Sequence, residues 1–81
     1  MEKYFVYVLR SKIKNITYVG CTNDLHRRFV EHNSGKSRFT RKYKPWEIIY
    51  SEEVSSRLEA LQKEKYFKSS AGRKKLKTLL S

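Results

Sequence analysis

Cysteine and long hydrophobic runs are the features that this sequence has least of. Its one cysteine, Cys21, excludes an intramolecular disulfide and cannot by itself supply the ligands of a zinc site. No stretch approaches the roughly 18 apolar residues that a membrane span requires. The first residues, Met1 to Tyr4, lack the charged segment and apolar run of a secretory signal. We therefore expect a cytoplasmic protein that does not bind membranes.

Acidic residues are scarce as well. Eight Asp and Glu stand against 19 Lys and Arg, which gives a formal net charge of +11. An excess of this size favours polyanionic partners and repels itself in the folded state. Nucleic acid, with DNA foremost, is therefore the expected partner. An anionic membrane surface ranks second on charge alone and is not expected as a partner, and a merely solubilising surface is the plain alternative.

The chain is short, and its core must be small. With 81 residues it allows a single domain, 1–81, in which active-site groups share the few elements that make the fold. Only 38% of the residues are hydrophobic, but 14% are aromatic. Aromatic side chains each bury a large area, so few apolar positions are enough to close a core.

Two strands are predicted at the start of the chain. Residues 4–9 form an unbroken aromatic and aliphatic run, too short for a helix, which indicates a strand buried on both faces. Residues 16–19 form a second run after a short polar interval, and Gly20 is expected to end it. If this hairpin turns near residues 12–13, Tyr7 lies opposite Tyr18.

A helix is predicted next. Thr22 and Asn23 are the candidate N-caps, and Asp24 places a negative charge in the first turn. Residues 33–35 (Asn-Ser-Gly) are typical of a helix end. Four residues recur at helical spacing and define one face: Leu25, Arg28, Phe29 and His32.

The second half of the chain adds one strand and further helix. Residues 36–44 form a loop with five basic residues in nine, and residues 46–50 form a third strand. A helix is expected from Ser55 or Ser56 to about residue 70, followed by an interruption at Gly72 and a short basic helix over 73–80. The order ββαβα(α) predicts an α+β domain: a three-stranded, mainly antiparallel sheet flanked by helices.

The first helix carries polar groups on its apolar face. Arg28 and His32 share that face, whereas Arg27 and Glu31 take the solvent side. A charge on a buried face is costly unless it is paired or opens into a cleft. Either Arg28 extends along the rim of the core and reaches solvent, or it serves a site. His32 is either a satisfied core or capping histidine, or a member of that site.

The second predicted helix also carries a charged residue on its apolar face, but here the charge is negative. Glu64 falls near the centre of its apolar arc and is the one acid after Gln62, among seven basic residues. An ion pair with Lys68 is one account, worth about 0.3–0.5 kcal/mol. The other is an oxygen ligand for Mg²⁺, which often takes one or two carboxylates beside phosphates. The arc consists of Val54, Leu58, Ala60, Leu61, Phe67 and Ala71.

Tyr7 and Tyr18 allow two interpretations. A cross-strand aromatic pair is an ordinary packing device. Phenols also carry a proton, so two of them beside Arg28 and Glu64 could position and deprotonate a water molecule. The residues alone leave both interpretations open.

With these residues in place, the sequence resembles the GIY-YIG nuclease superfamily. Its first motif is matched by Phe5-Val6-Tyr7 and its second by Tyr18-Val19-Gly20, with the required ten residues between the tyrosines. The stretch from Cys21 to His32 is similar to the family's catalytic helix, in which an Arg is followed by a His four residues later. That step selects Arg28. Residues 59–69 resemble the metal-binding helix, with Glu64 as the ligand.

The resemblance implies hydrolysis of a phosphodiester bond with one metal ion. Tyr7, as phenolate or through a bridging group, would take the proton of the attacking water, and Tyr18 would orient it. A base role for Tyr7 requires nearby cations to lower its pKa. Glu64 would hold Mg²⁺ or Mn²⁺, Arg28 would stabilise charge on the phosphate oxygens, and His32 would hydrogen-bond a tyrosine or a phosphate.

The substrate must then be held by the basic surface of the domain itself. Phosphate contacts carry little sequence information, so we expect weak sequence preference, with branched, flapped or single-stranded DNA as possible targets. The alternative is a non-catalytic nucleic-acid-binding module with the same fold. The expected contacts lie in two sets, Lys36, Arg38, Arg41, Lys42 and Lys44 in the loop and Lys68, Arg73, Lys74, Lys75 and Lys77 near the C-terminus.

Overall fold

The computed structural model describes residues 3–80 and confirms the predicted order of elements. Three antiparallel strands form one sheet in the order β2-β1-β3. Among the described residues, no helix is long and apolar enough to cross a membrane. The elements are β1 (Tyr4–Ser11), β2 (Thr17–Thr22), α1 (Leu25–Ser34), η1 (Thr40–Lys42), β3 (Trp46–Val54), α2 (Arg57–Lys68) and α3 (Ser70–Leu80).

Strand β1 is the centre of the sheet. Val6 and Val8 point to one face and Tyr7 and Leu9 to the other, and each is at most 1% exposed. A strand paired on both edges and covered on both faces must be apolar throughout, which the unbroken run predicted. The sheet therefore presents two separate surfaces on which helices pack.

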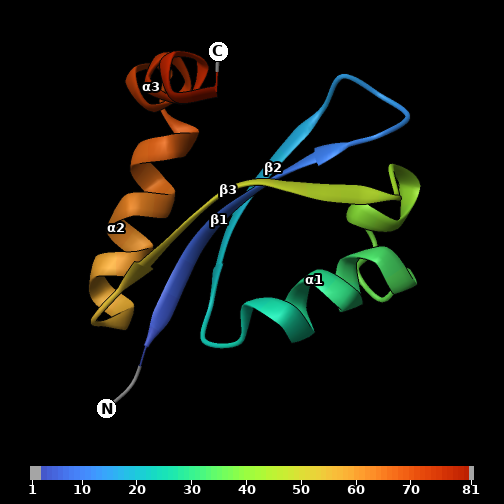
Figure 1. The fold of residues 1–81 in the computed structure, drawn as a ribbon, viewed down its shortest axis with the longest axis horizontal. Helices are drawn as coiled ribbons and strands as arrows, with labels where there is room; N and C mark the ends of the chain where they lie inside the picture. Colours follow the sequence, from blue (N-terminus) through green and yellow to red (C-terminus); the bar gives the residue numbers. More distant parts are fainter. Residues whose placement is uncertain (1–2, 81) are drawn as a thin grey trace.

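The helices divide between these two surfaces (Figure 1). Helix α1 and the short η1 cover one face, and α2 and α3 cover the other. Tyr7, Leu9 and Trp46 form the buried core under α1. The buried core on the opposite face consists of Val6, Val8, Val19, Val54, Ala60, Phe67 and Leu76.

The predicted register of the β1–β2 hairpin is wrong by two residues. Tyr7 pairs with Gly20, and Tyr18 pairs with Leu9. The loop is longer than assumed, because Ser11 closes it by bonding from its N–H to the carbonyl of Ile16 at 3.0 Å. A shift of two residues preserves the face of each side chain, so both tyrosines still point toward α1.

Gly20 does not end β2, contrary to expectation. The strand continues to Thr22 and remains paired with β1 throughout. A β-carbon at Gly20 would lie 2.6 Å from the hydroxyl oxygen of Tyr7. The glycine is thus required by the close approach of a phenol, not by a turn.

Helix α1 begins one position later than the candidate N-caps. Asp24, rather than Thr22 or Asn23, has the extended backbone of an N-cap, and its carboxylate accepts from the N–H of Arg27 at 3.1 Å. The Thr22 hydroxyl instead accepts from the N–H of Asp24 at 3.1 Å, which fixes the turn before the helix. Gly35 ends α1 with φ 89°, as predicted.

The predicted apolar face of α2 is partly wrong. Ala60 and Phe67 are buried, but Leu58 and Leu61 are 67% and 43% exposed. Ala60 packs in the core against the sheet, and the two leucines lie on the outer side of the helix. Glu64, one turn after Ala60, remains at the edge of the buried face.

Gly72 lies inside α3 instead of interrupting the helices. Helix α2 ends at Lys68, and α3 starts at Ser70. A β-carbon at Gly72 would overlap the carbonyl oxygen of Tyr66 and come within 2.5 Å of Cα of Phe67. The glycine lets the first turn of α3 pack directly against the backbone of α2.

Replacing Gly72 by Ala tests this close contact. Helix propensity alone predicts a gain of about 1 kcal/mol, whereas the overlap with Tyr66 predicts a loss of about 1–3 kcal/mol. We expect the loss, measured by urea unfolding followed by circular dichroism. Lys74→Ala, on the exposed part of α3, is the matched control and should change stability little. A stabilised Gly72→Ala variant would contradict the close packing of the two helices.

Candidate functional site

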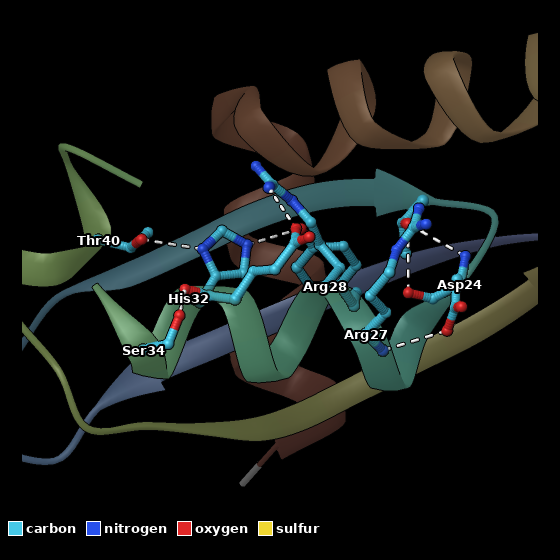
Figure 2. A network of polar contacts seen from close by, with 9 residues as sticks. Asp24, Arg27, Arg28, His32, Ser34 and Thr40 are labelled. Carbon is cyan, nitrogen blue, oxygen red and sulfur yellow. Dashed lines mark hydrogen bonds and ion pairs between the residues drawn. The ribbon is translucent and has the colours of Figure 1, made fainter. Parts of the chain in front are cut away.

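A buried chain of hydrogen bonds connects β1, α1 and η1. The hydroxyl of Tyr7 lies 2.9 Å from Nε2 of His32, and Nδ1 of His32 lies 2.9 Å from Oγ1 of Thr40. Figure 2 shows His32 extending from α1 toward Thr40. All three side chains are at most 1% exposed. The three hydrogen-bonded side chains are therefore closed to bulk water.

Two further contacts fix the far end of this chain. The indole N–H of Trp46 donates to the carbonyl of Thr40 at 2.8 Å. The side chain of Asn33, on α1, bonds both the N–H and the carbonyl of Trp46, at 2.6 and 3.2 Å. Thr40, in the basic loop, was not among the predicted site residues, because a single Thr in a basic loop carries no periodic signal. Tertiary contacts alone give it a role.

His32 is neutral at physiological pH. Burial and the nearby Arg28 guanidinium lower its pKa from 6.5 to about 4, against a smaller opposing effect of Glu31. When Nδ1 carries the proton, it donates to Thr40, and Nε2 is left to accept from the Tyr7 hydroxyl. His32 is thus a buried histidine with both ring nitrogens hydrogen-bonded, which was one of the two predictions for it. It also fixes the hydroxyl of Tyr7, a candidate catalytic residue.

Tyr7 is a neutral phenol in this structure. Burial, followed by the nearby Tyr18, raises its pKa to about 12, and the opposing effect of Arg28 is too small to compensate. The requirement that cations lower this pKa is therefore not met in the free protein. A proton can still leave Tyr7 by transfer to the imidazole that it already contacts.

Tyr18 is the more accessible of the two phenols. It lies on the edge strand β2 and is only partly buried. Its ring centroid is 6.4 Å from that of Tyr7 and 5.0 Å from that of His32. On its outer side it packs against Phe39 at 6.1 Å. Tyr18 therefore stands between the buried hydrogen-bond chain and solvent.

Arg28 lies beside both tyrosines, as its helix phase predicted. Its charge acts on the pKa of Tyr7, while its side chain remains 37% exposed. Nη1 of Arg28 bonds Oε1 of Glu31 at 3.0 Å. Glu31 was assigned to the solvent side, and its spacing of three residues from Arg28 was the signal for this pair. Arg27 is exposed.

Glu64, on α2, approaches strand β2 from the face of the sheet opposite to Tyr18. Its Oε1 accepts from the thiol of Cys21 on β2 at 3.1 Å, and its Oε2 accepts from Lys68 Nζ at 2.8 Å. Burial tends to raise the pKa of Glu64, but the bonds from Lys68 and Cys21 outweigh it and lower the pKa, so the carboxylate is ionised. The predicted ion pair with Lys68 is present, and the contact with Cys21 was not foreseen.

This carboxylate is compatible with a metal ion held mainly by substrate. Among residues 3–80, no three His, Cys, Asp or Glu side chains gather as a metal site. Mg²⁺ often takes a single protein carboxylate, with phosphate oxygens and water completing its octahedron. Each oxygen of Glu64 has one partner and retains capacity to accept another. The residues present fit a metal bound in this way.

The predicted basic residues near the C-terminus line more than one hollow of the surface. All ten lysines and arginines of the two sets are exposed. Lys68 and Arg73 line a groove beside Tyr18, whereas Lys75 lines a separate hollow with Glu52 and Tyr66. Only part of the second set therefore borders the tyrosines.

Comparison with known proteins agrees with this geometry. The family model described as the GIY-YIG catalytic domain matches residues 3–77. The chain belongs to the GIY-YIG family. It is 44% identical to the UPF0213 protein YazA of Bacillus subtilis, over 91% of this chain and 75% of that protein. It is also 44% identical to a UPF0213 protein of Limosilactobacillus reuteri, over 98% of this chain and 84% of that protein.

A solved relative has the same fold. The solution structure of the UPF0213 protein BH0048 from Bacillus halodurans superposes with a TM-score of 0.58 at 31% identity, covering 95% of this chain and 84% of that one. The GIY-YIG domain implies nuclease-type function and a nucleic-acid substrate. Members of the family generally use divalent metal ions.

The buried state of His32 predicts how stability depends on pH. Its pKa is lower in the folded protein, about 4, than the ordinary 6.5, so the unfolded chain binds more protons between these values. The stabilisation is complete above pH 6.5 and is lost as pH falls toward 4. A shift of this size corresponds to about 3 kcal/mol.

Urea unfolding of wild type and of His32→Gln between pH 8 and 4 measures this contribution. Gln keeps an amide donor and acceptor but does not titrate, so the difference between the two stabilities should shrink as the pH is lowered. Parallel curves would show that His32 has an unshifted pKa.

Proposed function

We propose that this protein is a metal-dependent endonuclease that hydrolyses phosphodiester bonds in DNA with little sequence specificity, in the cytoplasm. One observation carries the proposal. In this GIY-YIG domain, Tyr18 of the edge strand β2 lies beside Tyr7, His32 and Arg28 on one face of the sheet, and Cys21 of the same strand bonds Glu64 on the other. Proton-transfer groups, a cation and a carboxylate thus converge on one strand.

Proton removal is assigned to the Tyr7–His32 pair. As the water attacks phosphorus, its proton passes to the hydroxyl of Tyr7, while the proton of Tyr7 passes to Nε2 of neutral His32. The product of this transfer is an imidazolium that Thr40 orients from the other side. The negative charge of a bound phosphate favours that imidazolium, which is disfavoured in the free protein. Tyr18, the more exposed phenol, orients the water or a phosphate oxygen.

Arg28 is assigned to the developing charge. Its guanidinium is exposed enough to reach a phosphate and is held beside the tyrosines by Glu31 at 3.0 Å. A donor fixed before the reaction needs no reorganisation as charge builds on the non-bridging oxygens.

Glu64 is assigned to the metal, Mg²⁺ or Mn²⁺. Such an ion, when bound there, stabilises charge on the leaving oxygen. Lys68 bonds one oxygen of this carboxylate at 2.8 Å, and the charge of a bound metal ion would repel it. Because Lys68 is half-exposed on a flexible stem, it can turn to a phosphate of the substrate instead.

Weak sequence specificity follows from the surface. Contacts from exposed Lys and Arg are made to phosphates, which are identical in every sequence. The alternative, a binding module without catalysis, is favoured by one observation: Tyr7 is buried and its pKa is about 12. Incubation of the pure protein with linear, flap and junction DNA, with and without Mg²⁺ or Mn²⁺, decides between the two.

Glu64→Gln tests the metal assignment. The variant keeps the shape of the side chain and removes its charge, so metal-dependent cleavage should be abolished while DNA binding is retained or tightened. Glu52→Gln is the matched control, because Glu52 forms a similar ion pair with Lys63 at 3.0 Å and bonds Tyr50 rather than Tyr7 or Tyr18. Normal cleavage by Glu64→Gln would refute the assignment, and so would an equal loss in Glu52→Gln.

The neighbouring arginines provide a second test. Arg28→Ala should lower the single-turnover rate on the order of 10²–10³-fold, as the loss of one fixed donor to developing charge typically does. Arg27→Ala removes the same charge one position away on an exposed side chain and should cost only salt-dependent binding. Both variants are checked for folding by circular dichroism. Equal damage from the two substitutions would mean that Arg28 acts only through its charge.

A further inference from the structure

A groove of about 410 Å³ runs along the outer side of β2, next to the candidate site. Its floor is formed by residues 17–19 of the edge strand, which include Tyr18. Phe39, from the basic loop, forms one wall, and Lys68 and Arg73 stand on the other. A volume at the lower end of the range for small-ligand pockets accommodates one nucleotide but no protein domain or duplex.

Phe39 is an aromatic ring held in an exposed position. It is 49% exposed, although it packs against Tyr18 at 6.1 Å and Tyr43 at 5.4 Å between centroids. Nothing among residues 3–80 covers the rest of the ring. Because two neighbouring rings fix it, a flat partner can stack on Phe39 with little loss of side-chain freedom.

The opposite wall supplies positive charge. Arg73 forms no ion pair with any described residue, and the ammonium of Lys68 is shared with Glu64 at 2.8 Å. The groove therefore offers an aromatic surface on one side and cations on the other. This combination is complementary to a nucleotide, which has a flat base and a charged phosphate.

The place of the groove relates it to the reaction. Tyr18 lines it directly, and Lys68 connects it to the carboxylate of Glu64. A phosphate next to a base in this groove would lie beside both residues. A base in a continuous duplex is stacked on both faces and paired at its edge, so it cannot enter without being extruded.

We propose that this groove binds one unpaired base, stacked on Phe39, and that the protein therefore acts on single-stranded or extrahelical nucleotides. This inference rests on the proposed nuclease function for the cleavage step. The binding step, however, stands on the groove alone and is tested without catalysis.

The test is fluorescence anisotropy in EDTA, with a labelled single-stranded oligonucleotide, the same strand with abasic sites, and a perfect duplex. Phe39→Leu keeps an apolar side chain and removes the ring. It should weaken binding of the intact strand about 5- to 100-fold, as stacking of one base on an aromatic ring predicts. Binding of the abasic strand and of the duplex should not change. Phe39→Trp should restore binding of the intact strand.

Tyr66→Leu is the matched control, since Tyr66 is an aromatic residue 45% exposed that lines a different hollow. Thermal melting confirms that each variant is folded. A loss that is equal for intact strand, abasic strand and duplex overturns the proposal, and so does no loss at all. If Phe39→Leu shows the base-dependent loss but wild type cleaves no DNA, the nuclease function has failed and the binding groove stands. If wild type cleaves DNA but Phe39→Leu shows no base-dependent loss of binding, the nuclease function stands and the proposed binding groove is refuted.

Discussion

The hydrogen bond between Tyr7 and His32 is the interaction on which the rest of the site depends. It joins the central strand to α1, and through Thr40 it reaches the basic loop. Each partner is almost fully buried, so the loss of any one leaves a polar group without a partner, which costs about 1–3 kcal/mol. Among residues 3–80, every buried side-chain polar atom has a hydrogen-bond partner. In so small a core, this chain is both part of the fold and the expected proton path.

The edge strand β2 carries the second constraint, because it must serve both faces of the sheet. Alternation along a strand sends Tyr18 toward α1 and Cys21 toward α2. Between them, Gly20 has no side chain, and the hydroxyl of Tyr7 fills that space. The two halves of the site are therefore separated by the thickness of a single strand.

The high positive charge of the protein destabilises the folded state, and binding of a nucleic-acid substrate would reduce this repulsion. With +11 on 81 residues, neighbouring cations repel one another in the folded state. Two of the few acidic residues form ion pairs next to the candidate site, Glu31 with Arg28 and Glu64 with Lys68. Most of the remaining cations lie exposed on the loop of residues 36–44 and on α3, where a polyanion can neutralise them. Phe39 is exposed between Arg38 and Arg41, a position that also suits contact with a nucleic acid.

The sequence by itself determined the order of the elements, the buried central strand, the phase of Arg28 and the end of α1 at Gly35, because each depends on the spacing or type of neighbouring residues. It also indicated the polar residues that share a core face. Only the tertiary structure decided the hairpin register, the roles of Gly20 and Gly72, the outward turn of Leu58 and Leu61, and the raised pKa of Tyr7. These depend on which distant backbone or ring comes close. Periodicity states which face of an element is buried, but not what it is buried against.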